Sequence, residues 1–125
     1  MTRLNLKSLP GRFAVCKLAP DAGIPSGLDE GALYSVTRTE NELSIVCRDA
    51  QDLPGKFERG WCCLEVEGPL EFTLVGVLAS LTQPLAEAGA SIFALSTFDT
   101  DYLLVKETQF ESALAALQAA GHRIS

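Results

Sequence analysis

The stretch from residue 71 to residue 105 constrains the fold more than any other part of the chain. From Val77 onward its apolar residues recur at the spacing of one helix face, and Gly89 supplies a C-terminal cap. Pro84 lies inside this pattern and removes a backbone bond to the carbonyl four residues earlier, so we expect a kink or a shifted register but no break. Two strands should follow, joined by a turn at residues 97–101.

The residues on either side of this stretch complete a recognisable order. Residues 61–67 form an apolar strand before the helix, and a capping box of Thr108 and Glu111 predicts where a second helix begins. Gly121 ends that helix, and a short strand follows at residues 122–124. The order is therefore β-α-β-β-α-β, which right-handed crossovers would fold into a four-stranded antiparallel sheet with both helices on one face.

The first half of the chain contains strands and turns but no helical period. Residues 3–9 and 12–18 predict an opening hairpin, and residues 20–31, rich in proline and glycine, form a long loop. Residues 32–38 and 42–48 predict a second hairpin, which echoes the one in the second half with one residue inserted. We therefore expect an α+β chain of two tandem ferredoxin-like modules. Residues 1–60 would form a degenerate, strand-rich module, and residues 61–125 the complete one.

The charge balance excludes several classes of function. Sixteen Asp and Glu stand against ten Lys and Arg, without a basic cluster, so nucleic acid is not an expected partner. The N-terminus has no long apolar segment of a secretory signal, and no apolar run is long enough to span a membrane. A cytoplasmic protein that binds a small molecule fits this balance.

No pattern in the chain indicates catalysis, a metal or a cofactor. The four cysteines lack C-x-x-C spacing, and His122 is the one histidine, so we expect buried reduced thiols and no zinc. Phosphate loops, nucleophile elbows and dinucleotide fingerprints do not occur. We expect His122 to bond to the last carbonyls of a helix and assign it no function. The sequence predicts a protein that is not an enzyme.

Three segments resemble the ACT domains, small βαββαβ modules that bind amino acids and regulate metabolism. They are the glycine at the helix start (LVGVL, 74–78), the helix end (PLAEAG, 84–89) and the strand pair SIFALSTFDTDYLLV (91–105). The resemblance is strong over residues 61–125 and weaker over residues 1–60. It is closest to tandem-ACT proteins, which include bacterial stand-alone ACT proteins, cytosolic arginine sensors of animal cells and the regulatory ends of aspartate kinases.

The resemblance implies a ligand site at the helix start and the strand–strand turn. The unpaired N–H groups of the helix start favour a carboxylate, and Gly76 would let it approach, although tight helix packing explains this glycine equally well. Asp99 and Asp101 could hold an ammonium group, and their alternative role is ordinary turn chemistry. By analogy, Ile92 and Phe93 pair with a partner module; the simpler role is packing on the helices. The predicted ligand-binding residues are Leu74, Val75, Gly76, Val77, Ile92, Phe93, Ser96, Thr97, Asp99, Thr100 and Asp101.

The site departs from the commonest ACT pattern, because Leu74 and Val75 precede the glycine where that pattern has an acidic residue and a proline. This departure leaves the identity of the ligand open. The leading hypothesis is an allosteric, homodimeric sensor of an amino acid. The runner-up is a module that has lost its ligand and regulates a partner protein by sheet pairing, and a small enzyme ranks last.

Overall fold

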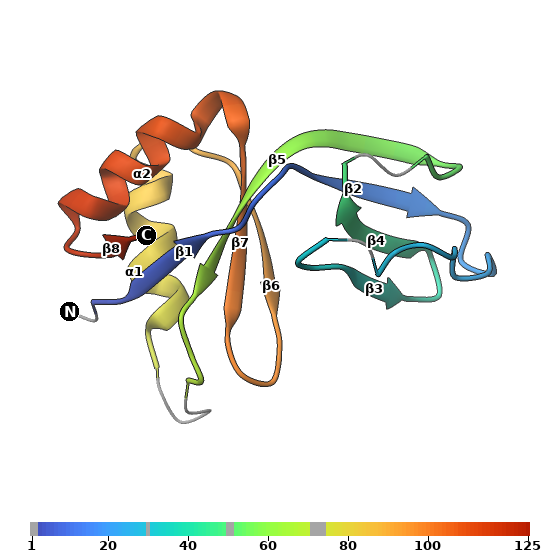
Figure 1. Ribbon diagram of the computed structural model, residues 1–125, viewed down its shortest axis with the longest axis horizontal. Coiled ribbons are helices and arrows are strands. Elements are labelled where there is room, and N and C mark those ends of the chain that lie inside the picture. The colour runs from blue at the N-terminus through green and yellow to red at the C-terminus, as the bar shows by residue number, and fades with distance from the viewer. Residues whose placement is uncertain (1–2, 30, 50–51, 71–74) are drawn as a thin grey trace. The chain divides into compact units, whose positions relative to one another are not determined.

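The computed structural model describes residues 3–29, 31–49, 52–70 and 75–125 (Figure 1). The chain divides into two compact units. The larger unit combines Met1–Leu9 with Cys62–Ser125, and the smaller unit is Pro10–Trp61. The division at Trp61 is one residue from the boundary expected after residue 60. The first nine residues, however, belong with the C-terminal part, whereas we expected them in the N-terminal module.

The larger unit follows the expected β-α-β-β-α-β order and adds one strand at its start. Its sheet runs in the order β8-β1-β5-β7-β6. In Figure 1 both helices cover the same face of this sheet. The elements are β1 (Asn5–Ser8), β5 (Lys56–Val66, of which residues 62–66 belong here), α1 (Val77–Glu87), β6 (Ile92–Ser96), β7 (Asp101–Lys106), α2 (Phe110–Ala119) and β8 (Arg123–Ile124).

The position of β1 corrects two predictions. It pairs antiparallel with β5 and parallel with β8, so the sheet is mixed and not purely antiparallel. The predicted hairpin of residues 3–9 and 12–18 does not form, since β2 (Phe13–Leu18) pairs with β4 (Leu43–Arg48) and β5 instead. The reason is burial, because Leu4 and Leu6 complete the core of the larger unit.

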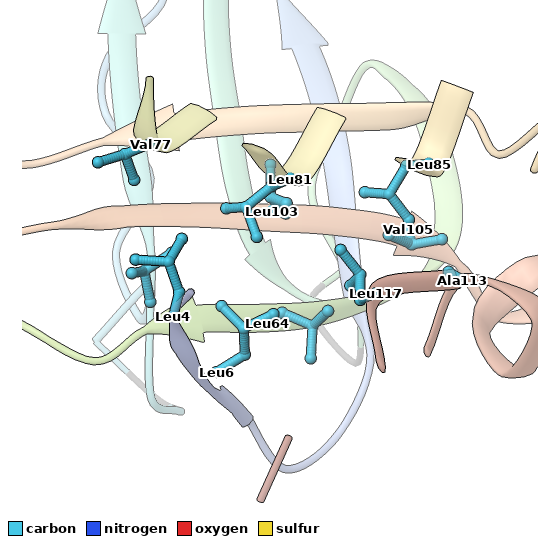
Figure 2. Packing of buried hydrophobic residues seen from close by; sticks show 11 residues of the cluster. Leu4, Leu6, Leu64, Val77, Leu81, Leu85, Leu103, Val105, Ala113 and Leu117 are labelled. Carbon is cyan, nitrogen blue, oxygen red and sulfur yellow. The ribbon is translucent and has the colours of Figure 1, made fainter. Parts of the chain in front are cut away.

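That core fills the space between the helices and the sheet (Figure 2). Leu6, Leu81, Leu85, Leu103 and Leu117 are fully buried in it. Figure 2 shows side chains of β1, β5 and β7 meeting those of α1 and α2. The apolar face of the sheet therefore packs against the apolar faces of the helices, as the sequence pattern predicts.

Both helices end as predicted, at a glycine. After α1, the N–H of Gly89 bonds to Ala86 and that of Ala90 bonds to Leu85, each at 3.0 Å. The same two bonds recur at the end of α2, around Gly121. Gly89 and Gly121 have φ of 75° and 99°, the left-handed conformation in which glycine avoids steric strain.

The predicted capping box of Thr108 and Glu111 is wrong. A short 3₁₀ turn, η1 (Glu107–Gln109), precedes α2, whose N-cap is Gln109 and has no side-chain capping bond. The amide of Gln109 instead accepts the N–H of Ser91 at 3.2 Å and donates to the carbonyl of Gly89 at 3.1 Å. The side chain of Gln109 therefore bonds to the turn between α1 and β6 and does not cap α2.

The smaller unit consists of strands in the order β3-β4-β2-β5, with β3 at Ser35–Arg38. The expected β3–β4 hairpin is present, and Thr39 Oγ1 accepts the N–H of Asn41 and of Glu42 in its turn. The described residues of this unit include no helix, in keeping with the expected strand-rich character. That this unit is a degenerate second module is still a prediction.

One further property bears on location. Among the described residues, no helix has the length and apolar character needed to cross a bilayer.

Candidate functional site

Within the described residues, no side-chain cap bonds to the backbone N–H groups at the start of α1. Gly76 is the N-cap, with φ 79° and ψ 6°; there is no side-chain capping bond and no acidic residue in the first turn. A Cβ added to Gly76 would meet nothing within 4 Å. The left-handed backbone of Gly76 accounts for a glycine here, and no contact with another described residue calls for tight packing.

The residues next to Gly76 differ in their surroundings. Val75 is 82% exposed, whereas Val77 is 7% exposed and belongs to the core. The side chain of Val77 therefore packs into the core and does not face a ligand at the helix start. Leu74 lies outside the described residues.

The β6–β7 turn uses most of its polar groups internally. The hydroxyl of Ser96 donates to the Asp101 carboxylate at 2.7 Å, and Thr97 Oγ1 donates to the Thr100 carbonyl at 3.1 Å. The backbone N–H of Thr97 donates to the same carbonyl at 2.8 Å. For Ser96, Thr97 and Asp101 these bonds match ordinary turn chemistry.

The turn is also attached to the segment that leads toward α1. The hydroxyl of Thr100, which is buried, donates to the carbonyl of Val66 at 2.5 Å. The N–H of Leu70 donates to the carbonyl of Asp99 at 2.7 Å. Because β6 runs opposite to α1, its turn lies at the same end of the unit as the helix start, as Figure 1 shows. The side chain of Asp99 is exposed, and its carboxylate makes no hydrogen bond to another described residue.

Ile92 and Phe93 lie at the other end of β6. Ile92 pairs with Val105 at the start of the strand, while Ser96 pairs with Asp101 at its end. At about 3.3 Å per residue, roughly 13 Å of strand separates Ile92 from Ser96. The predicted residues therefore form two groups in one protomer, one at the helix start and turn and one at the far end of an outer strand.

A tyrosine–carboxylate pair on the sheet was not predicted. The hydroxyl of Tyr102 donates to Glu65 Oε2 at 2.8 Å. Burial, together with the bond to Glu65 and its charge, raises the pKa of Tyr102 to about 12. The alternation of β5 and β7 places both side chains on the face opposite the helices, but their pairing depends on a register that the sequence does not reveal.

Three surface cavities of about 310, 300 and 290 Å³ lie elsewhere. Two belong to the smaller unit, and each contains a pair of cationic residues, Arg12 with Arg48 and Lys17 with Lys56. The third lies in the larger unit between the ends of β1 and β8. None of these three cavities is lined by a predicted ligand-binding residue.

The described residues include no cluster of three or more side chains able to hold a metal. All four cysteines are buried and unpaired with one another. Burial raises the pKa of Cys16 and Cys47, and it raises that of Cys63 to about 12. These thiols are poor nucleophiles near neutral pH because the reactive form is the thiolate.

A family model of the ACT domain matches residues 56–119, just over half of the chain. The chain belongs to the ACT domain family. A second family model, described as an N-terminal domain, matches residues 11–54. No curated protein sequence matches the chain. The family model confirms the resemblance predicted from the helix start and the β6–β7 segment.

Solved structures resemble the fold of nearly the whole chain. Protein Atu0741 from Agobacterium tumefaciens is 37% identical, with a TM-score of 0.92 and coverage of 100% of this chain and 94% of that one. Aspartate kinase from Clostridium acetobutylicum is 9% identical, with a TM-score of 0.67 over 96% of this chain and 35% of its own. The regulatory subunit of aspartate kinase from Thermus thermophilus is 14% identical, with a TM-score of 0.60 over 90% and 94%. At these identities, the two kinase likenesses concern the fold alone.

Proposed function

We propose that this ACT protein is a regulatory sensor that binds a small amino acid where α1 begins beside the β6–β7 turn. The observation that carries the proposal is the helix start, which has neither a side-chain cap nor an acidic residue and has open space in front of Gly76. The first N–H groups of a helix lack intrahelical partners and attract a carboxylate. The Asp99 carboxylate at the same end would hold the ammonium group by a charge-assisted bond.

Regulation would act through the pairing of protomers. Among the described strands of the larger unit, β6 pairs with β7, and a strand of a second copy would pair with the other edge of β6. Ile92 and Phe93 at the far end of β6 would then approach the partner's site in an antiparallel pair. A ligand bound between protomers shifts the population of their arrangements by its difference in affinity, which is the physical basis of allostery here.

A cytoplasmic location fits the chemistry of the cysteines. Four buried thiols without a disulfide suit a reducing compartment.

A thermal-shift screen of the twenty amino acids tests the ligand. A ligand at a hundred times its dissociation constant should stabilise the fold by about 2.7 kcal/mol. Gly76→Asp should abolish the shift, since the added carboxylate repels a ligand carboxylate. The left-handed φ of 79° costs an Asp about 1–2 kcal/mol, so the unfolding transition of the variant is measured beside the screen. Gly89→Asp is the matched control, because Gly89 has a similar φ of 75° and an equally open Cβ position at the other end of α1. Equal binding by both variants would contradict the site.

The other edge of β6 also favours a second candidate function, a ligand-free module that pairs its sheet with a partner protein. Sedimentation of the chain with and without the amino acids separates the two. The sensor predicts a dimer whose stability changes with one ligand. A dimer indifferent to all twenty would favour the second candidate.

A further inference from the structure

Three polar side chains stand in one row across neighbouring strands of the larger unit. Asn5 pairs with Arg123 in the parallel ladder of β1 and β8. On its other side, the carbonyl of Asn5 accepts the N–H of Glu67 at 2.9 Å, directly after the paired residues Leu6 and Val66. Residues opposite one another in a ladder point to the same face. A carboxylate, an amide and a guanidinium therefore follow one another across three strands.

This row lies on the face of the sheet away from the helices. Leu6 and Val66 belong to the core beneath α1 and α2, and Ile124 packs against that core. Alternation along each strand turns Asn5, Glu67 and Arg123 to the opposite face, where all three are exposed. A cavity of about 290 Å³ lies at the row, and its lining residues are Asn5, Leu6, Glu67, Arg123, Ile124 and Ser125.

The two charges of the row are opposite but not joined. Neighbouring strands are about 4.8 Å apart, so the backbones of Glu67 and Arg123 stand roughly 10 Å apart across Asn5. The ion pairs of the described part of the chain do not include one between them. A small molecule with a positive and a negative group can occupy the interval and bond to both. The cavity of about 290 Å³ is just below the range for drug-sized ligand pockets, which begins at about 300 Å³, and suits a small ligand.

We propose that this row is a binding site for a small zwitterion. The guanidinium of Arg123 would take the ligand's carboxylate in its two-pronged geometry, and the Glu67 carboxylate would accept from the ligand's ammonium group. The Asn5 amide, which both donates and accepts, would bond to either group between them. Because the row lies on the face opposite α1, it is a separate site and does not depend on the site proposed at Gly76.

The test uses the full-length ¹⁵N-labelled chain and three probes: L-alanine, acetate and methylammonium. L-alanine should shift the backbone amides of Asn5, Glu67 and Arg123 saturably, with an affinity at least about tenfold above that of either half-probe. Glu67→Gln and Arg123→Gln should each weaken L-alanine binding about tenfold or more, since each removes one charge-assisted bond. Lys7→Gln is the control, because Lys7 is exposed on the same face in the next row.

Two results would overturn the proposal. One is the lack of saturable shifts at the row with L-alanine. The other is equal binding of acetate and L-alanine, with no effect of Glu67→Gln, which would describe a simple anion site. Gly76→Asp separates this site from the proposed sensor site, since it should leave the shifts at the row unchanged. Loss of those shifts in Gly76→Asp would refute the independence of the two.

Discussion

The Nε2 atom of His122 lies 2.9 Å from the backbone oxygen of Ser80, in the middle of α1. Pro84, four residues later, has no N–H to offer this oxygen. The other ring nitrogen of His122, Nδ1, accepts the N–H of Leu4 at 3.1 Å. A backbone N–H can only donate and a carbonyl can only accept, so these two bonds require Nδ1 to accept and Nε2 to donate. His122 thus joins β1 and α1 to the end of α2.

Replacing this histidine should destabilise the fold strongly. His122→Ala leaves the N–H of Leu4 and the carbonyl of Ser80 buried without partners, at a cost of about 2–4 kcal/mol in the free energy of unfolding. Gln118→Ala, on the exposed side of α2, should change it by no more than about 0.5 kcal/mol. Urea unfolding of both variants measures the difference. Similar midpoints would show that His122 carries no structural bond of importance.

The link between His122 and Pro84 can be measured directly. In Pro84→Ala the new N–H is able to bond to the Ser80 carbonyl, so the loss of His122 should cost less in that background. We expect the double variant to be more stable than the sum of the single effects predicts, by about 0.5–2 kcal/mol. Urea unfolding of the two single variants and the double variant completes the cycle. Strict additivity would mean that the two residues do not serve the same carbonyl.

Two glycines of the smaller unit should respond differently to alanine. Gly55 has φ 119°, and a Cβ there would lie 2.4 Å from the carbonyl oxygen of Lys17. Gly11 has φ 81° with nothing within 4 Å of the added Cβ. Gly11→Ala should cost about 1–2 kcal/mol for the left-handed backbone alone. Gly55→Ala adds a clash with the backbone of β2 and should cost at least about 2 kcal/mol more, as measured by denaturant unfolding.

The larger unit should lose stability at alkaline pH because of Cys63. Burial, with smaller effects of Glu65 and Cys62, raises the pKa of this thiol from 9.0 to about 12. Above the unfolded value the unfolded chain releases a proton that the folded chain keeps, so the free energy of unfolding falls until the folded pKa is passed. Urea unfolding between about pH 8 and pH 11 should show this slope, and Cys63→Ala should reduce it. An unchanged slope in Cys63→Ala would assign the effect to other groups.

Much of the larger unit follows from local pattern. The apolar stripe of α1, the glycine ends of both helices and the β6–β7 turn depend on residues within a few positions of one another, and all agree with the sequence. The capping box failed because the amide of Gln109 bonds across to Gly89 and Ser91 instead. A local signal for a helix start does not include such distant partners.

In the candidate sites, too, some features follow from the local sequence and others depend on distant parts of the chain. The sequence left two roles open for the glycine at the start of α1, access for a ligand and tight packing, and in the structure Gly76 is left-handed with no described atom near an added Cβ. The sequence did not reveal that the hydroxyls of Ser96 and Thr97 donate hydrogen bonds within the β6–β7 turn. The row of Asn5, Glu67 and Arg123 depends on the insertion of β1 between β5 and β8. Strand alternation specifies the face of a residue but not its partner strand.

Pro84 illustrates the difference between what the local sequence determines and what the tertiary structure determines. The sequence by itself determined that a proline inside α1 would leave the carbonyl of Ser80 without its helical partner, because that bond is local. Only the tertiary structure decided that His122, 42 residues away, would supply the missing donor. The packing of α2 on α1, and the strand β1 placed beside β8, bring the imidazole there, and neither is encoded by residues close to Pro84 in the chain.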